Sequence, residues 1–191
     1  MVHSAVLLID IQPEWYTQSH ISGLFPKIPE NVKRLLTFCR AHNDFEVIHV
    51  RARYEENSDS YTADRENWSV WISTFKELHP DKTIEIDGTN CVEDFAREIE
   101  EERVFMKPTF DGFLGTDLHE YLQSRGIKRL LLAGLLTSVC VQATACSAFV
   151  RGYRLELVED CCGDRTMERH QAALLLYGNY MYKVVSSNDV R

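Results

Sequence analysis

The chain has 191 residues, of which 45% are hydrophobic and 26% are charged, and its formal net charge at pH 7 is −8. This composition is typical of a globular protein of one domain, and we expect a single domain over residues 1–191. The acidic balance argues against non-specific binding to nucleic acid or to an anionic membrane, because both need a basic face.

The cysteines and the N-terminus predict a reducing compartment. None of the six cysteines forms a C-x-x-C pair, and the first residues, MVHSAVLLIDIQPEW, have no basic segment before the apolar run. That pattern differs from a secretory signal peptide, and no apolar run reaches the length of a transmembrane helix. We therefore expect a cytoplasmic protein with free thiols and no membrane partner.

Apolar runs typical of buried strands alternate with segments of helical periodicity along the chain. The predicted strands are residues 4–11, 46–53, 103–106, 129–135, 154–159 and 182–186. The predicted helices are residues 29–42, 92–100, 115–125, 138–151 and 166–177. This alternation predicts an α/β fold: a three-layer α/β/α sandwich around a six-stranded, mostly parallel sheet with strand order 3-2-1-4-5-6.

One long segment interrupts the alternation. Residues 54–81 are polar and aromatic, and they contain Trp68 and Trp71. An excursion of this length after a strand is more often a lid or a binding segment than a linker. The sequence leaves open whether it would cover a site or contact another subunit.

Three residues able to carry chemistry lie at or just past predicted strand ends: Asp10, Lys107 and Cys140. Each has an ordinary structural explanation: a helix cap, a solvated turn and core packing. In a parallel sheet, however, those ends share one edge, where ligands bind. Cys140 would attack a carbonyl as a thiolate, Asp10 would accept and return the proton, and Lys107 would stabilise both anions. Backbone N–H groups at the helix start would stabilise the oxyanion.

The chain resembles the isochorismatase-like cysteine hydrolase superfamily. The matching stretches are LLIDIQPEW (7–15), KPTFDGFLGTDLHEYLQSRGI (107–127), LLLAGLLTSVCVQATACSAFVRGY (130–153) and LVEDCCGDRTMERH (157–170). The resemblance implies a catalytic triad of Asp10, Lys107 and Cys140, and a homodimer or homotetramer. It also implies a cis peptide bond between Leu135 and Leu136, which would aim the Leu136 N–H, together with that of Cys140, at the oxyanion.

Two departures from relatives narrow the expected activity. Nicotinamidases carry a His-containing metal site after the second strand, whereas this chain reads RARYEENSDSYTADRENW there, with acids but no His. We therefore expect no metal and no cofactor. Strict isochorismatases typically have Gly where Cys140 stands, which favours hydrolysis of a carbon–nitrogen bond in a small amide or ureide. The alternatives are vinyl-ether hydrolysis of isochorismate and a catalytically weak binding or assembly protein of the same fold.

Candidate substrate-binding residues surround the expected site. Arg51, Arg53 and Tyr54 leave the second strand at this edge and would bind a carboxylate, with a surface or ion-paired arginine as the alternative. Aromatic residues would line a pocket for a small planar group, with ordinary core packing as the alternative; the candidates are Trp15, Trp71 and Phe113.

Residues beside and beyond the candidate nucleophile have supporting roles in this interpretation. Thr137 is a candidate substrate-binding residue and is expected to fix the loop before Cys140, and Ser138 is a candidate helix cap. His170 is assigned a structural or subunit-contact role, because the triad needs no histidine.

Overall fold

The computed structural model describes residues 3–55, 85–86 and 88–191. Trp71 and almost all of the predicted 54–81 excursion lie outside these residues. Among the described residues, no helix is both long and apolar enough to cross a membrane.

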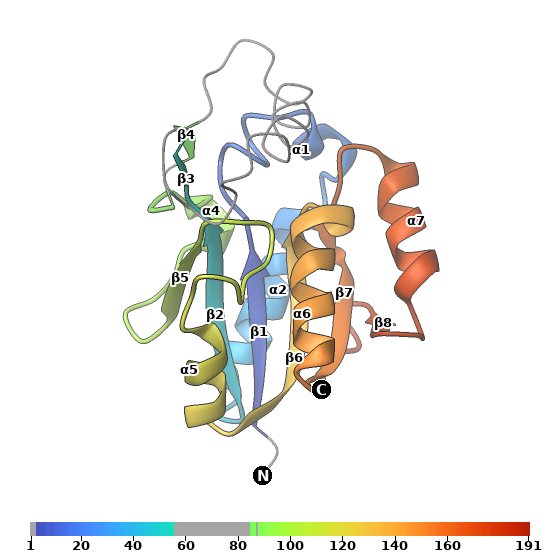
Figure 1. Cartoon of the computed structure of the whole chain (residues 1–191). Coiled ribbons are helices and arrows are strands. Elements are labelled where there is room, and N and C mark those ends of the chain that lie inside the picture. Colours follow the sequence, from blue (N-terminus) through green and yellow to red (C-terminus); the bar gives the residue numbers. More distant parts are fainter. Residues whose placement is uncertain (1–2, 56–84, 87) are drawn as a thin grey trace.

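A parallel six-stranded sheet forms the centre of the fold, with the order β5-β2-β1-β6-β7-β8 (Figure 1). Its strands are β1 (His3–Ile9), β2 (Phe45–Ala52), β5 (Arg103–Lys107), β6 (Ile127–Leu135), β7 (Arg154–Gly163) and β8 (Lys183–Val185). In chain order this is 3-2-1-4-5-6, so the predicted fold class and strand order are confirmed. A second, antiparallel ribbon joins β3 (Tyr54–Glu55) to β4 (Glu85–Ile86).

Helices cover both faces of the sheet. Helices α2 (Ile28–Ala41) and α4 (Glu93–Ala96) pack on one face, and α5 (Leu118–Ser124) and α6 (Gln142–Val150) pack on the other, in front of the sheet in Figure 1. Helix α7 (Met167–Tyr177) flanks β7, and a short α1 (Ile21–Leu24), which the sequence analysis did not predict, follows β1.

The central strand shows why the predicted runs were apolar throughout. In β1, Val6 and Leu8 join the core beneath α2, whereas Ala5, Leu7 and Ile9 join the core beneath α5 and α6. Each of these side chains is buried, because a parallel sheet covered on two faces exposes neither face of its central strands. Apolar side chains thus fill both faces of the central strand, and the polar side chains Asp10 and Lys107 lie at strand ends.

The predicted helix over 138–151 begins differently. Residues Thr137–Val141 form a π-helical turn, in which the Val141 N–H donates to the Leu136 carbonyl over 3.2 Å, and α6 starts only at Gln142. A π-turn inside a helix is rare and frequently marks a functional site. Cys140 therefore lies in the wide turn that precedes the regular helix.

The fifth predicted strand was too short. It continues to Gly163, because Gly134 and Leu135 of β6 pair with Cys162 and Gly163. Cys161 and Cys162 are therefore buried free thiols within β7, on opposite faces, and do not follow the strand as the sequence suggested.

The predicted helix over 92–100 was too long, since α4 ends at Ala96. The residues after it are held by tertiary contacts instead of helical hydrogen bonds. The Arg97 carbonyl accepts from Arg40 over 2.9 Å, the Ile99 N–H donates to Glu102 over 3.2 Å, and Glu98 pairs with Arg51.

The predicted helix over 115–125 was also too long at its start, because α5 begins at Leu118. The Thr116 hydroxyl donates to the Gly112 carbonyl over 2.6 Å and accepts from the Leu118 N–H over 3.4 Å. Thr116 thus closes a turn that precedes the helix.

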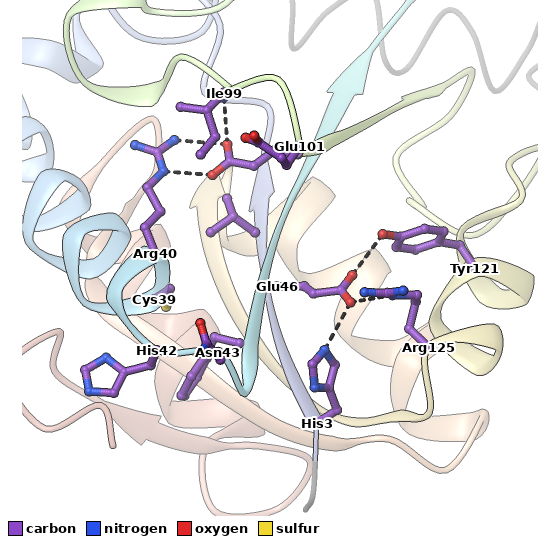
Figure 2. Close-up of a pocket in the computed structure, with 13 residues that line it drawn as sticks. His3, Cys39, Arg40, His42, Asn43, Glu46, Ile99, Glu101, Tyr121 and Arg125 are labelled. Carbon is purple, nitrogen blue, oxygen red and sulfur yellow. Dashed lines mark hydrogen bonds and ion pairs between the residues drawn. The ribbon is translucent and has the colours of Figure 1, made fainter.

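A pocket lies at the amino ends of β1 and β2, opposite the strand ends that carry Asp10 and Lys107. Figure 2 shows His3, Tyr121 and Arg125 converging on the Glu46 carboxylate, at 3.0, 2.9 and 2.6 Å. The Arg125 guanidinium offsets the charge of the Glu46 carboxylate, and none of the predicted site residues lines the pocket.

A second carboxylate of the pocket lining, Glu102, immediately precedes β5 and contacts side chains of α2 and β2. It accepts from Arg40 Nε over 2.7 Å and Nη2 over 2.9 Å, and it lies 2.8 Å from His49 Nε2. Burial opposes its charge, but the bonds from His49 and Arg40 dominate and lower the pKa of Glu102 to about 2. Because the folded pKa is below the unfolded one, this stabilisation is complete above about pH 4.5 and is lost as pH falls toward 2.

We predict that Glu102→Gln lowers the free energy of unfolding at pH 7 by roughly 2–3 kcal/mol, because it removes a charge that Arg40 and His49 face. The difference from wild type should shrink as pH falls below about 4.5. Urea unfolding at several pH values measures both effects. The exposed neighbour Glu101 supplies the control, since Glu101→Gln should change stability little at any of these pH values. A pH-independent loss in Glu102→Gln would contradict the assignment.

Candidate active site

A buried ion pair occupies the carboxyl edge of the sheet. Asp10 directly follows β1, Lys107 is the last residue of β5, and Lys107 Nζ lies 2.8 Å from Asp10 Oδ2. Both side chains are almost fully buried: Lys107 is 0% exposed and Asp10 is 1% exposed. The sequence placed both residues at this edge, and the structure brings them into direct contact across β2.

The backbone at Asp10 has an unusual conformation. Its φ is 51°, in the left-handed region that residues other than glycine seldom adopt, and its N–H donates to the Val50 carbonyl over 2.8 Å. Two residues on, the Gln12 side chain bonds both backbone groups of Ala52, donating over 3.1 Å and accepting over 2.9 Å. These contacts fix the chain that carries Asp10 against the end of β2.

Burial and the ion pair act in opposite directions on the two charges. Burial raises the pKa of the Asp10 carboxyl above its ordinary value, and the Lys107 ammonium offsets part of that rise. Burial works to lower the pKa of Lys107, but the Asp10 carboxylate and Cys140 outweigh it, so the pKa of Lys107 is raised. Lys107 therefore keeps its proton, and Asp10 is a stronger base than a solvated carboxylate.

Cys140 completes the cluster from the π-turn. Its thiol is buried and lies within hydrogen-bonding reach of both Asp10 and Lys107. Burial raises the pKa of the Cys140 thiol above its usual value; Lys107 lowers it and Asp10 raises it further. The resting residue is therefore a thiol beside a base, which differs from the thiolate that a helix N-terminus alone would favour.

The strand that leads to Cys140 passes very close to β1. Gly134 has a φ of +131°, and a Cβ there would lie 1.9 Å from the Ile9 carbonyl oxygen. The next peptide bond, between Leu135 and Leu136, is cis. The close approach thus places the cis bond directly beside the point where Asp10 leaves β1.

Thr137 and His170 hold the turn from the side of α7. The Thr137 hydroxyl bonds the Gly163 carbonyl over 3.0 Å and His170 Nδ1 over 2.8 Å. Because a hydroxyl has one proton and a carbonyl can only accept, His170 Nδ1 carries the proton and donates to Thr137. Burial lowers the pKa of His170, which keeps the ring neutral. Thr137 therefore supports the loop, and its hydroxyl is engaged away from the Asp10–Lys107 pair.

Asp164 takes the capping role that was predicted for Ser138. The Ser138 N–H donates to Asp164 Oδ2 over 2.6 Å, and the Arg165 N–H donates to Asp164 Oδ1 over 2.8 Å. Asp164 is fully buried, and it follows β7 at the same edge as the ion pair. Local sequence pointed to Ser138 as the cap, because Asp164 is 26 residues away along the chain.

The two candidate arginines differ in their surroundings. Arg51 is 4% exposed, pairs with Glu98 and donates to the Thr89 carbonyl over 3.3 Å. Arg51 therefore has the ion-paired role that was the alternative to binding a carboxylate. Arg53 is exposed, and its backbone N–H donates to the Lys107 carbonyl over 3.0 Å.

Among the aromatic candidates, Trp15 lies at the site and Phe113 does not. The Trp15 ring is edge-on to Tyr54, with centroids 6.5 Å apart, and Tyr54 Oη is 3.1 Å from Lys107 Nζ. Phe113 is buried in the core beneath α5 and α6, stacked on Tyr153 with centroids 6.0 Å apart. Phe113 is thus a core residue.

In the part of the chain that the structure describes, no three His, Cys, Asp or Glu side chains group as a metal site. The expectation of no metal rests on the segment after β2, which lies mostly outside those residues, and it stays a prediction.

Comparison with known proteins gives one family. The isochorismatase domain model matches residues 4–189. The uncharacterized isochorismatase family protein YddQ of Bacillus subtilis is 30% identical over 166 residues, which cover 86% of this chain and 80% of that protein. Maleamate amidohydrolase of Pseudomonas putida is 34% identical over 191 residues, which cover 97% of this chain and 84% of that enzyme.

A solved structure shares the whole architecture. N-carbamoylsarcosine amidase from Thermoplasma acidophilum superposes with a TM-score of 0.78, covering 100% of this chain and 99% of that one, at 20% identity. At this identity the likeness establishes the fold alone.

We predict that Gly134→Ala destabilises the protein by more than about 3 kcal/mol, because the new Cβ would meet the Ile9 carbonyl. Gly126 is the matched control: it also has positive φ, +68°, but open space around it. Gly126→Ala should cost only about 1 kcal/mol of backbone strain. Thermal unfolding of both variants measures the difference, and equal losses would contradict the close approach.

Proposed function

The chain belongs to the isochorismatase family, and we propose that it is a cysteine hydrolase that cleaves a carbon–nitrogen bond of a small amide or ureide through a thioester on Cys140. The observation that carries the proposal is the buried pair of Asp10 and Lys107, 2.8 Å apart and within hydrogen-bonding reach of the Cys140 thiol. One relative supports the reaction class, since the name maleamate amidohydrolase describes amide hydrolysis.

In the first step, the Cys140 sulfur attacks the substrate carbonyl carbon while its proton passes to Asp10. The raised pKa of Asp10 suits this role, because a base works best when its pKa is near the working pH. The buried thiol does not need to ionise beforehand, because the proton leaves as the carbon–sulfur bond forms. Lys107 stays charged and stabilises the anion as it develops.

The carbonyl electrons move onto oxygen, which then needs hydrogen-bond donors. We assign this role to the N–H groups of Leu136, which directly precedes the π-turn, and of Cys140, which lies within it. Leu136 follows the cis bond, and its carbonyl is engaged by the N–H groups of Val139 and Val141, at 3.0 and 3.2 Å. That internal bonding fixes the turn before the reaction, as oxyanion stabilisation requires.

The tetrahedral intermediate collapses when the carbon–nitrogen bond breaks and Asp10 gives its proton to the leaving nitrogen. The amine or ammonia departs, and the acyl group remains on Cys140. Water then attacks the thioester and passes a proton to Asp10. When the carbon–sulfur bond breaks, Asp10 returns that proton to the sulfur, so the sum is amide plus water giving acid plus amine.

We predict that Cys140→Ala and Asp10→Asn each lower turnover by at least about 10³-fold, because each removes a group whose bonds change in the reaction. Ammonia release from a panel of small amides and ureides, including maleamate and N-carbamoylsarcosine, provides the measurement. Cys146→Ser, in helix α6 and outside the cluster, is the control and should retain wild-type turnover.

Strong amide hydrolysis by Cys140→Ala would contradict the thioester mechanism. Consumption of isochorismate by that variant would favour vinyl-ether hydrolysis, which needs Asp10 but not the thiol. Wild-type protein that hydrolyses nothing in the panel and no isochorismate would favour a binding role. Chelators should leave amide turnover unchanged.

A further inference from the structure

The Lys107 ammonium uses all three of its N–H groups within the protein. Its Nζ lies 2.8 Å from Asp10 Oδ2, 3.1 Å from the Tyr54 hydroxyl and 3.0 Å from the Thr109 carbonyl. An ammonium has three donors and no acceptor, so these contacts can occupy its donors, and the Cys140 sulfur, also within hydrogen-bonding reach, is a further acceptor. Lys107 therefore acts through its charge and its position, and Tyr54 is one of the groups that set that position.

Tyr54 is itself held rigidly. It pairs with Ile86 in the β3–β4 ribbon, and its ring lies edge-on to Trp15, 6.5 Å between centroids. The side chain is 2% exposed, and the Lys107 ammonium lies 5.5 Å from the ring centroid. The fixed ring therefore holds the hydroxyl at the cluster, so little conformational entropy is lost when the hydroxyl forms a hydrogen bond there.

The Tyr54 hydroxyl has one proton, and among the described residues the Thr109 carbonyl and the Cys140 sulfur are acceptors within its reach. It donates to the Thr109 carbonyl over 3.1 Å, and it also lies within hydrogen-bonding reach of the Cys140 sulfur. It cannot donate to Lys107, whose ammonium is a donor only. When Cys140 loses its proton, the sulfur becomes the stronger acceptor, because hydrogen bonds to charged groups are about twice as strong as neutral ones.

We propose that Tyr54 is a fourth member of the catalytic cluster, which fixes the Lys107 ammonium and donates a hydrogen bond to the Cys140 sulfur as negative charge develops there. The inference rests on the proposed function, because it concerns the formation of that nucleophile. Burial and the nearby charges of Cys140 and Asp10 raise the pKa of Tyr54 well above its usual value, so the hydroxyl keeps the proton that this role needs. Substrate binding, the role considered for Tyr54 from sequence, would use the same hydroxyl differently.

The test is Tyr54→Phe, which retains the ring and removes only the hydroxyl. We expect iodoacetamide to alkylate Cys140 about tenfold more slowly than in wild type at a fixed pH near 8, measured by mass spectrometry of the Cys140 peptide. Tyr153→Phe is the matched control, because Tyr153 is also buried and bonds His119 Nδ1 over 2.9 Å beneath α5, away from the cluster. That variant should leave the Cys140 rate unchanged.

The direction of the change separates this role from a structural one. A variant that merely loosened the site would expose Cys140 and speed its alkylation, whereas loss of the hydrogen bond slows it. With an amide that the wild type hydrolyses, we expect kcat of Tyr54→Phe to fall about 10–100-fold with KM nearly unchanged.

An unchanged or faster alkylation rate together with an unchanged kcat would overturn the proposal for Tyr54. A rise in KM at constant kcat would also overturn it, in favour of substrate binding. Neither result would affect the thioester mechanism, which the Cys140→Ala and Asp10→Asn variants test separately.

Discussion

The ion pair between Asp10 and Lys107 is the interaction on which the site depends. Removing two charges from water is costly, and the cost is recovered only when the charges are close and their remaining hydrogen bonds are satisfied. Here Lys107 Nζ and Asp10 Oδ2 are 2.8 Å apart, and the Tyr54 hydroxyl and the Thr109 carbonyl accept further hydrogen bonds from the ammonium. The same burial raises the pKa of Asp10, so the arrangement that makes the pair costly also makes Asp10 a better base.

The sheet brings these residues together across the chain. Asp10 and Lys107 are separated by 97 positions in sequence (107 minus 10), yet Asp10 directly follows β1 and Lys107 ends β5, and both strands flank β2. Cys140 arrives from β6 on the other side of β1, by way of Gly134 and the π-turn. Every side chain of the proposed triad therefore lies at a strand end or in the turn that follows one, and the buried apolar strands fix the distances between them.

Much of this arrangement was predictable because it depends on local patterns. Apolar runs located the strands, and the rule that parallel strand ends share an edge placed Asp10, Lys107 and Cys140 together before any contact was known. The parts that sequence missed depend on pairs distant along the chain. Arg51 pairs with Glu98, and Asp164 bonds the Ser138 N–H, and neither partner is marked by periodicity or spacing.

The π-turn and the left-handed Asp10 were equally hidden from sequence. Residues 138–151 have an ordinary helical pattern. The wide first turn is seen only in the structure, where the Val141 N–H donates to the Leu136 carbonyl. An aspartate in a sequence does not by itself predict the left-handed conformation, so the conformation of Asp10 follows from tertiary contacts. Phe113 was a candidate pocket residue from sequence. In the structure it packs against Tyr153 and belongs to the hydrophobic core.

The central claim, an acyl group carried on Cys140, is tested most directly by partitioning between water and hydroxylamine. Both nucleophiles would attack the same thioester, giving acid and hydroxamate. For a primary amide and an N-methyl amide of the same acid, the account predicts one hydroxamate-to-acid ratio, because the leaving nitrogen has departed before the partition. A ratio that changes with the leaving group would contradict a common thioester intermediate.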